Sequence, residues 1–189
     1  SGSEETGVES LQNLRLSKEE MGCLSIWKMP DKSKRYRNRY IVVMDVGGVS
    51  DEADYTDITV FDRYWMMDGG IPEVVAEWHG HIDHDKGAWK AVQMATFYAD
   101  EEDAMVVRES NTLETEGTEG NNFEYILDEI AGHYSNLYCR TPADQIRQGA
   151  PAKWGFHTNT STKPMVISHQ AKAIRDSLYI ERCEEAVDE

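Results

Sequence analysis

Two carboxylates stand where apolar segments of the chain give way to polar ones. Asp45 follows the unbroken apolar run Tyr40–Met44, and Glu109 ends the short apolar segment Met105–Glu109. If these segments are neighbouring parallel strands, both carboxylates emerge at one edge of a sheet, where open α/β folds build their sites. Two acids that close repel each other unless a cation lies between them. Mg²⁺ binds through one or two carboxylates plus phosphate, so the pair suits phosphodiester chemistry.

Each of the two acids also has a purely structural interpretation. Asp45 precedes Gly47 and Gly48, and an aspartate there can cap the strand exit through an Asx-turn. Glu109 can be an exposed strand-end residue that pairs with Arg108 or Lys90. Local sequence leaves both alternatives open.

Three further acids crowd the turn between the first two strands of the expected sheet. Asp51 and Asp54 fit a solvated charge run, whereas Asp57 starts a strand and could reach the edge that carries Asp45. Asp57 is therefore a candidate third metal ligand, although a turn-capping role suits its position better.

A histidine-rich segment follows the third expected strand. His79, His81 and His84 alternate with Asp83 and Asp85, and imidazole and carboxylate both bind divalent ions. The segment leaves a strand and enters a helix, so one of the two aspartates is better placed as the helix N-cap. No further ligand cluster accompanies it, which favours structural roles for the histidines.

The hydrophobic pattern predicts the elements that position these residues. Apolar and β-branched runs indicate strands, and a 3.6-residue period indicates helices. The expected strands are 24–27, 40–44, 57–64, 73–79, 105–109 and 137–139; the expected helices start at Ser17 (short), at 86 (to about 100), at Asn121 or Asn122 (to 132) and at 163 (to 178). The second and third long strands should form a hairpin, and 148–161 should be irregular. This order predicts an α/β fold: a mixed sheet with helices on its faces.

The domain organisation follows from composition. Residues 1–35 are expected to be an N-terminal arm or linker with a short strand, and 36–189 a single domain. No run approaches the 18 apolar residues of a membrane span, and no signal peptide is visible. The opening Ser-Gly-Ser suggests a piece of a longer protein.

Charge and motifs exclude several classes of function. The 189 residues carry a net charge of −16, which argues against a general nucleic-acid binder; 32–39 is the only dense basic stretch. The chain contains no P-loop, no dinucleotide fingerprint and no nucleophile elbow. Cys23, Cys139 and Cys183 are odd in number and widely spaced, so neither a disulfide framework nor a thiolate zinc site is predicted, and a reducing cytosol is expected.

Several segments in a fixed order resemble one family. The segment 40–48 with 54–62 resembles the opening of the nuclease domain of large terminase subunits, the DNA-packaging motors of tailed bacteriophages. Val106–Asn111 is similar to that family's second acidic strand. The stretch 136–138 with Trp154–Asn159 and Thr162–Pro164 is similar to its later part. The resemblance covers about 24–185.

The resemblance implies a ribonuclease H-like fold. It also implies a metal-dependent endonuclease that cuts concatemeric viral DNA into genome lengths. Asp45 and Glu109 fall on the family's catalytic carboxylates, which hold two Mg²⁺ or Mn²⁺ ions. The family's third acid has no counterpart here; it is expected beyond Glu189, after an acidic helix that Glu184, Glu185 and Asp188 resemble. This sequence alone is therefore expected to cut DNA poorly.

The resemblance also implies partners and a location. Double-stranded DNA, the N-terminal ATPase domain of the parent chain, the portal and the small terminase are the expected partners, in the host-cell cytoplasm. DNA contacts are expected from Arg147, Lys153, Lys163 and the basic stretch 32–39. One alternative is a ribonuclease H-like module that no longer cuts and docks other packaging proteins, which the acidic surface suits. A resolvase or transposase relative would leave the later similar segments unexplained.

Overall fold

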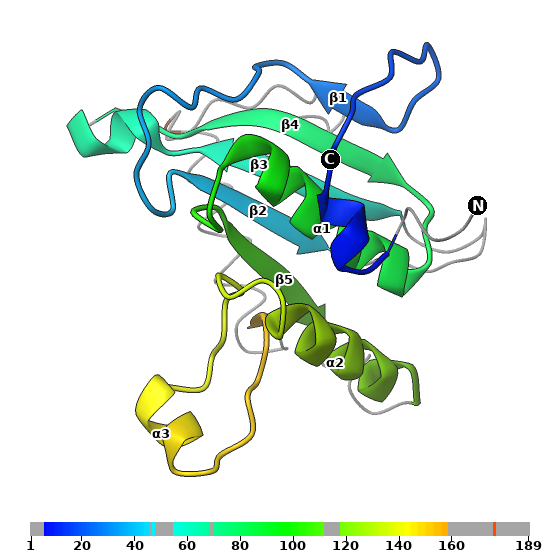
Figure 1. Cartoon of the computed structure of the whole chain (residues 1–189), viewed down its shortest axis with the longest axis vertical. Helices are drawn as coiled ribbons and strands as arrows, with labels where there is room; N and C mark the ends of the chain where they lie inside the picture. The colour runs from blue at the N-terminus through cyan, green and yellow to red at the C-terminus, as the bar shows by residue number, and fades with distance from the viewer. Residues whose placement is uncertain are drawn as a thin grey trace.

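The computed structural model describes residues 6–45, 47, 55–68, 70–111, 118–158 and 176. Short 3₁₀ helices (η), strands and helices follow one another along the chain (Figure 1). Their order and bounds are η2 Val8–Leu11, β1 Leu24–Ile26, β2 Tyr40–Asp45, β3 Thr56–Asp62, η3 Tyr64–Asp68, β4 Glu73–Gly80, α1 His84–Tyr98, β5 Met105–Asn111, α2 Thr118–Ala131, α3 Ala143–Arg147 and β6 Phe156–Thr158.

The strands form one mixed sheet in the order β1-β4-β3-β2-β5-β6. β2, β3 and β4 are antiparallel neighbours, while β2 pairs with β5, and β5 with β6, in parallel. The predicted α/β class and the β3–β4 hairpin are thus confirmed. No helix in the described part of the chain is long and apolar enough to cross a membrane.

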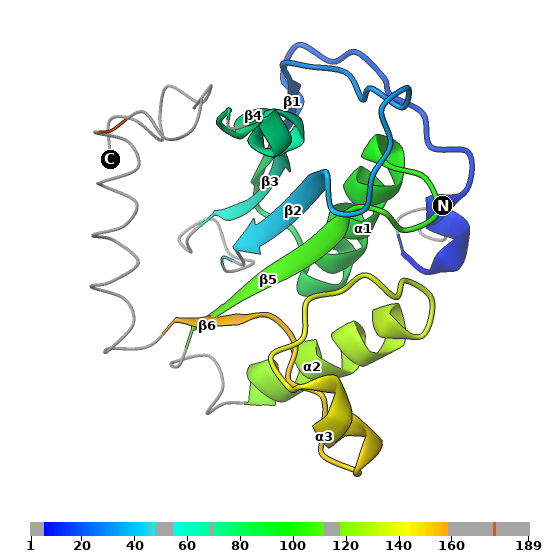
Figure 2. The same cartoon turned by 90° about the vertical axis from the view of Figure 1, so that its left-hand side faces the viewer.

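Side-chain alternation gives the sheet two unlike faces. In β2, Val42 and Met44 are buried, whereas Val43 and Asp45 lie on the other face. The buried face packs against α1, which contributes Trp89 to the same core. Helices α1 and α2 lie on the same side of the sheet (Figure 2). The opposite face of β2 therefore carries Asp45.

Some predicted boundaries are wrong for identifiable reasons. No helix starts at Ser17; its hydroxyl instead donates to Glu19 Oε1 at 3.2 Å. The strand predicted to reach Tyr64 ends at Asp62, because Asp62 Oδ1 accepts a hydrogen bond from the Tyr64 N–H and turns the chain into η3. Helix α2 starts at Thr118, before either predicted asparagine cap.

The later part of the chain also departs from expectation. The segment predicted as strand 137–139 makes only isolated bridges, from Leu137 to Val106 and from Cys139 to Trp154. Within the irregular region expected at 148–161, Phe156–Thr158 forms β6. The short helix α3 was not predicted. The helix predicted over 163–178 lies outside the described residues, apart from residue 176.

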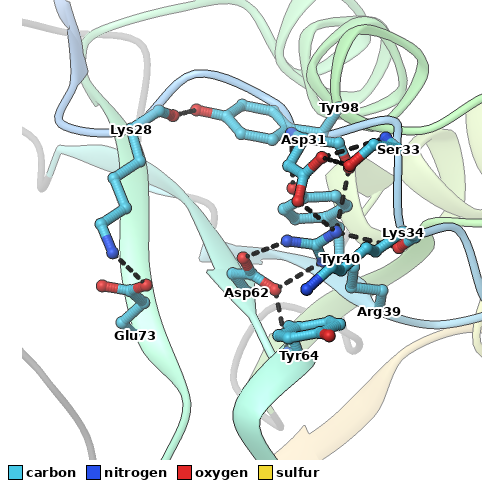
Figure 3. Close-up of polar contacts among 10 residues, drawn as sticks. All are labelled: Lys28, Asp31, Ser33, Lys34, Arg39, Tyr40, Asp62, Tyr64, Glu73 and Tyr98. Atoms are coloured by element: carbon cyan, nitrogen blue, oxygen red, sulfur yellow. Dashed lines mark hydrogen bonds and ion pairs between the residues drawn. The ribbon is translucent and has the colours of Figure 1, made fainter.

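Part of the N-terminal segment is built into the sheet. β1 pairs with β4, and Leu24 and Ile26 pack against the main core. Just after β1, the Lys28 ammonium donates to the buried Glu73 carboxylate at 2.5 Å, and the Lys28 carbonyl accepts from the Tyr98 hydroxyl at 2.7 Å (Figure 3). These contacts connect the segment to β4 and to the end of α1.

The Tyr98 contact gives a test of this connection. Tyr98→Phe leaves the Lys28 carbonyl without its donor, so we expect a loss of about 1 kcal/mol in the free energy of unfolding at neutral pH. Burial raises the pKa of Tyr98, so its contribution is present below a pH of about 10 and is lost above it. Urea unfolding from about pH 9 to pH 11 should show a shallower decline for Tyr98→Phe. An unchanged decline would contradict the assignment.

Candidate functional site at the carboxyl end of the central strands

Two acids face each other across the antiparallel pair β2–β3. Asp45 is the last residue of β2, and its register partner on β3 is Asp57. Register partners in an antiparallel pair lie on the same face of a sheet, with their Cβ atoms roughly 5 Å apart. The face is the one opposite α1.

Glu109 lies on the other side of β2 and extends the pair to three acids, Asp57, Asp45 and Glu109, which we call the carboxylate row. The parallel register of β2 and β5 runs up to the pair Met44 and Arg108, and Asp45 and Glu109 are the next residues of their strands. Both side chains alternate with buried neighbours, so they project from the face away from α1. The prediction that the two acidic strands are parallel neighbours with their acids at one edge is therefore confirmed.

Two contacts hold Gly47, the second residue after Asp45. The Gly47 N–H donates to Thr56 Oγ1 at 3.0 Å, which ties the exit of β2 to the first residue of β3. The Gly47 carbonyl lies 3.2 Å from Nε2 of His84, the first residue of α1. The backbone on both sides of Asp45 is thus held by β3 and α1.

The fourth side chain of the row is a histidine. His79 on β4 is the register partner of Asp57, and its Nδ1 lies 2.5 Å from Asp57 Oδ1. Tyr55 stacks on both His79 and His81, with ring centroids 4.3 and 4.2 Å away. Sequence reasoning missed Tyr55, because stacking depends on strand register.

The N-cap prediction concerns the next segment. Asp83 is the N-cap residue of α1, although its side chain makes no capping hydrogen bond.

A glycine allows β6 to approach β5 beside Glu109. Gly155 has φ of +78°, a left-handed conformation that favours glycine, and a Cβ there would collide with the backbone of Arg108. The next residue, Phe156, is the register partner of Glu109. The Trp154–Gly155–Phe156 segment, used above for the family resemblance, therefore has a structural reason to lie beside the second acid.

The donor set suits a hard divalent ion. Carboxylate oxygens are the ligands that Mg²⁺ prefers, and this ion keeps several waters when one or two carboxylates bind it. Within the described residues, no group of three or more His, Cys, Asp or Glu side chains is close enough to hold a metal ion. The arrangement thus offers the pair Asp45 and Glu109, with Asp57 beside it in contact with His79.

Several cations of the basic stretch 32–39 make contacts within the protein. Lys32 pairs with Asp100 at 2.8 Å, and Arg35 binds both Glu101 and Asp103. The Arg35 hydrogen bond lowers the pKa of the Glu101 carboxyl. These acids lie in the segment between α1 and β5, near the start of β2, whereas Asp45 is at its end. Lys32 and Arg35 are therefore paired with acids away from Asp45, which weakens the expectation that these two residues bind DNA.

Arg39 forms the centre of a buried network at that far end of the sheet (Figure 3). Its guanidinium donates to both carboxylate oxygens of Asp62 at 3.0 and 2.9 Å and to the carbonyls of Asp31 and Lys34. It also lies over the ring of Tyr64, 4.7 Å from the centroid. Burial disfavours the charge, but the hydrogen bonds with Asp62 outweigh it and raise the pKa of Arg39. The network joins the segment before β2 to the end of β3.

The other predicted DNA contacts are partly within the described chain. Arg147 on α3 and Lys153 before β6 are both exposed. Lys163 lies outside the described residues, as do the acidic positions Glu184, Glu185, Asp188 and Glu189.

Comparison with solved structures identifies the fold. The large terminase nuclease from thermophilic phage G20c superimposes with a TM-score of 0.51 over 89% of this chain and 69% of that chain, with 15% identical residues. The chain has the fold of a large terminase nuclease. A second structure of that nuclease, with bound magnesium, gives a TM-score of 0.54 over the same shares, with 16% identity.

This terminase nuclease fold is the ribonuclease H-like fold that the family resemblance implied, and it agrees with the α/β class predicted from the sequence pattern. No protein-family model and no curated protein sequence matches the chain, so the likeness rests on three-dimensional structure. At this level of identity the likeness shows the fold, and the function has to be argued from the carboxylate row.

Proposed function

We propose that this chain is a metal-dependent endonuclease domain that cuts concatemeric viral DNA during genome packaging. The observation that supports it is the placement of Asp45 and Glu109 on neighbouring parallel strands, at the same end and on the same face of the sheet. The fold shared with a phage terminase nuclease, one structure of which has bound magnesium, supports the same reaction class.

Asp45 and Glu109 are the residues that would hold the Mg²⁺ or Mn²⁺ ions of a two-metal site. Asp57 is the third carboxylate of the row, and its contact with His79 leaves its second oxygen, Oδ2, as the atom available to such an ion. Bound divalent ions would supply charge stabilisation at the phosphoryl group and a more acidic water.

The chain's own contribution is orientation. Asp45 and Glu109 sit on strands of a hydrogen-bonded sheet, and Gly47, just after Asp45, is held by Thr56 and His84. Rigid placement keeps the two carboxylates aimed at the same region before DNA arrives, which avoids the cost of ordering them during the reaction.

The wider role follows from the same proposal. Double-stranded DNA is the proposed substrate, with exposed Arg147 and Lys153, and Lys163, as its contacts. The proposed protein partners are a terminase ATPase domain of the parent chain, the portal and the small terminase subunit. The host-cell cytoplasm is the proposed location, since phage DNA is packaged there.

The metal site is tested without relying on activity. We expect crystals soaked in Mn²⁺ to show anomalous density between the carboxylates of Asp45 and Glu109, with the two groups about 4 to 6 Å apart. Titration calorimetry with Mn²⁺ should show heat that Glu109→Gln abolishes. Asp144→Asn on α3 is the matched control, because Asp144 is an exposed acid outside the row.

The alternative outcome is equally defined. If neither density nor binding heat is found, and supercoiled plasmid stays intact in Mg²⁺ and Mn²⁺, the nuclease proposal fails. The non-cutting docking module would then be the better account of this fold.

A further inference from the structure

The sheet has an open edge at β1. The Cys23 carbonyl accepts from the His79 N–H, and the Trp27 N–H donates to the Val75 carbonyl, each at 2.9 Å. Because backbone groups alternate in direction along a strand, those of Leu24 and Ile26 point away from β4. No described residue pairs with them on that side.

A groove extends from this edge along the second half of α1. Its two adjoining parts have volumes of about 100 and 720 Å³ and share Leu16, Leu24 and Ile26 in their lining. Phe97 of α1 lines one part and Trp27 the other. Leu16 is 46% exposed. The groove thus offers apolar surface next to unused backbone donors and acceptors.

Cations surround the groove in a strongly acidic protein. Arg15, Lys18 and Lys90 line it, against a single acid, Glu19. None of the three cations makes an ion pair with a residue that the structure describes, unlike Lys28, which pairs with Glu73 after β1. The groove therefore has a local positive charge although the whole chain carries −16.

We propose that the β1 edge and its groove bind an extended segment of a partner protein that is rich in acidic and apolar residues. The segment adds to the sheet as a strand beside β1, as in β-strand addition. Its backbone pairs with Leu24 and Ile26, its apolar side chains enter the groove, and its carboxylates face Arg15, Lys18 and Lys90.

Charge complementarity selects this occupant. A second copy of the chain, pairing β1 with β1, would bring two sets of these three cations together, which disfavours that dimer. The groove also lies on the α1 side of the sheet, whereas the carboxylate row faces the other side. Binding at the edge is therefore independent of the proposed nuclease site.

The test uses two labelled peptides of opposite charge on the full chain. One alternates glutamate and valine over about eight residues, an ordinary strand length, and the other alternates lysine and valine. Fluorescence anisotropy at low and high salt measures both affinities. We expect the acidic peptide to bind at least about tenfold more tightly than the basic one, with the difference reduced by salt.

Two kinds of variant locate the site. Ile26→Pro removes an N–H that points away from β4 and should weaken binding of the acidic peptide about tenfold or more, while Ser25→Ala on the same strand should not. Lys18→Glu with Lys90→Glu should reverse the preference between the peptides. Lys86→Glu, one turn from Lys90 on α1 but outside the groove lining, is the matched control.

Three results would overturn the proposal. They are equal affinity for the two peptides, no binding of either peptide, and an unchanged preference in the charge-reversed variant. Displacement of the acidic peptide by duplex DNA would assign the groove to nucleic acid, and a dimer in sedimentation that Ile26→Pro dissociates would assign it to a second copy. If Ile26→Pro does not fold, as circular dichroism would show, the charge-reversed variant decides alone.

Discussion

Asp45→Ala is expected to abolish metal-dependent nicking of supercoiled plasmid by the intact parent protein, with a loss of well over about a hundredfold. Groups that only support a metal ligand are worth about 10- to 100-fold in metal affinity or activity, and a ligand in direct contact is worth more. The fold should not suffer. Asp45 is exposed and faces Asp57 across β2 and β3, and like charges directly opposite each other destabilise a sheet.

The two readouts together distinguish a ligand from a structural cap. In EDTA, the melting temperature of Asp45→Ala should equal or slightly exceed that of the parent protein, and Asp144→Ala should keep both activity and stability. A large drop in the melting temperature of Asp45→Ala would mean that Asp45 caps the strand exit, the alternative left open by the sequence.

Arg39→Ala is expected to cost about 3 to 5 kcal/mol in the free energy of unfolding. The substitution leaves the buried Asp62 carboxylate without its counter-ion, and an uncompensated buried charge is costly. It also removes the donor that serves the carbonyls of Asp31 and Lys34. Urea denaturation followed by circular dichroism measures the loss.

The matched control is a neighbouring arginine with exposed partners. Arg35→Ala breaks ion pairs with Glu101 and Asp103, but its side chain is 42% exposed, so its loss of stability should be much smaller than that of Arg39→Ala. The double change Arg39→Met with Asp62→Leu should recover much of the stability, since no charge is then left buried. Equal losses for Arg35→Ala and Arg39→Ala would contradict the role given to the network.

The carboxylate pair could be predicted because its signals are local. The apolar run before Asp45 marks a strand buried between neighbours, and the acid marks its end; Glu109 repeats the pattern on β5. Parallel pairing of the two strands was the one assumption required, and the structure confirms it. The register that places Asp57 opposite Asp45 could only be suspected, because it depends on the turn between β2 and β3.

The ion pairs of the basic stretch 32–39 could not be predicted, because they join segments that are far apart in the sequence. Lys32 and Arg35 find their partners in acids that follow α1, far along the chain, and nothing in the sequence indicates this meeting. Local propensity likewise misplaced the helix expected at Ser17, where a hydroxyl–carboxylate contact with Glu19 occurs instead. Short elements such as β6 depend on neighbours supplied by β5.

The strand order has a consequence for how the protein is made. The hairpin β3–β4 pairs segments that are close in sequence, whereas β2 meets β5 only after the hairpin and α1 have been synthesised. Pairings between distant segments pay a larger loop-closure entropy and tend to form late. A nascent chain that stops before β5 holds Asp45 without Glu109. The carboxylate pair therefore forms only after β5 has been synthesised and has paired with β2.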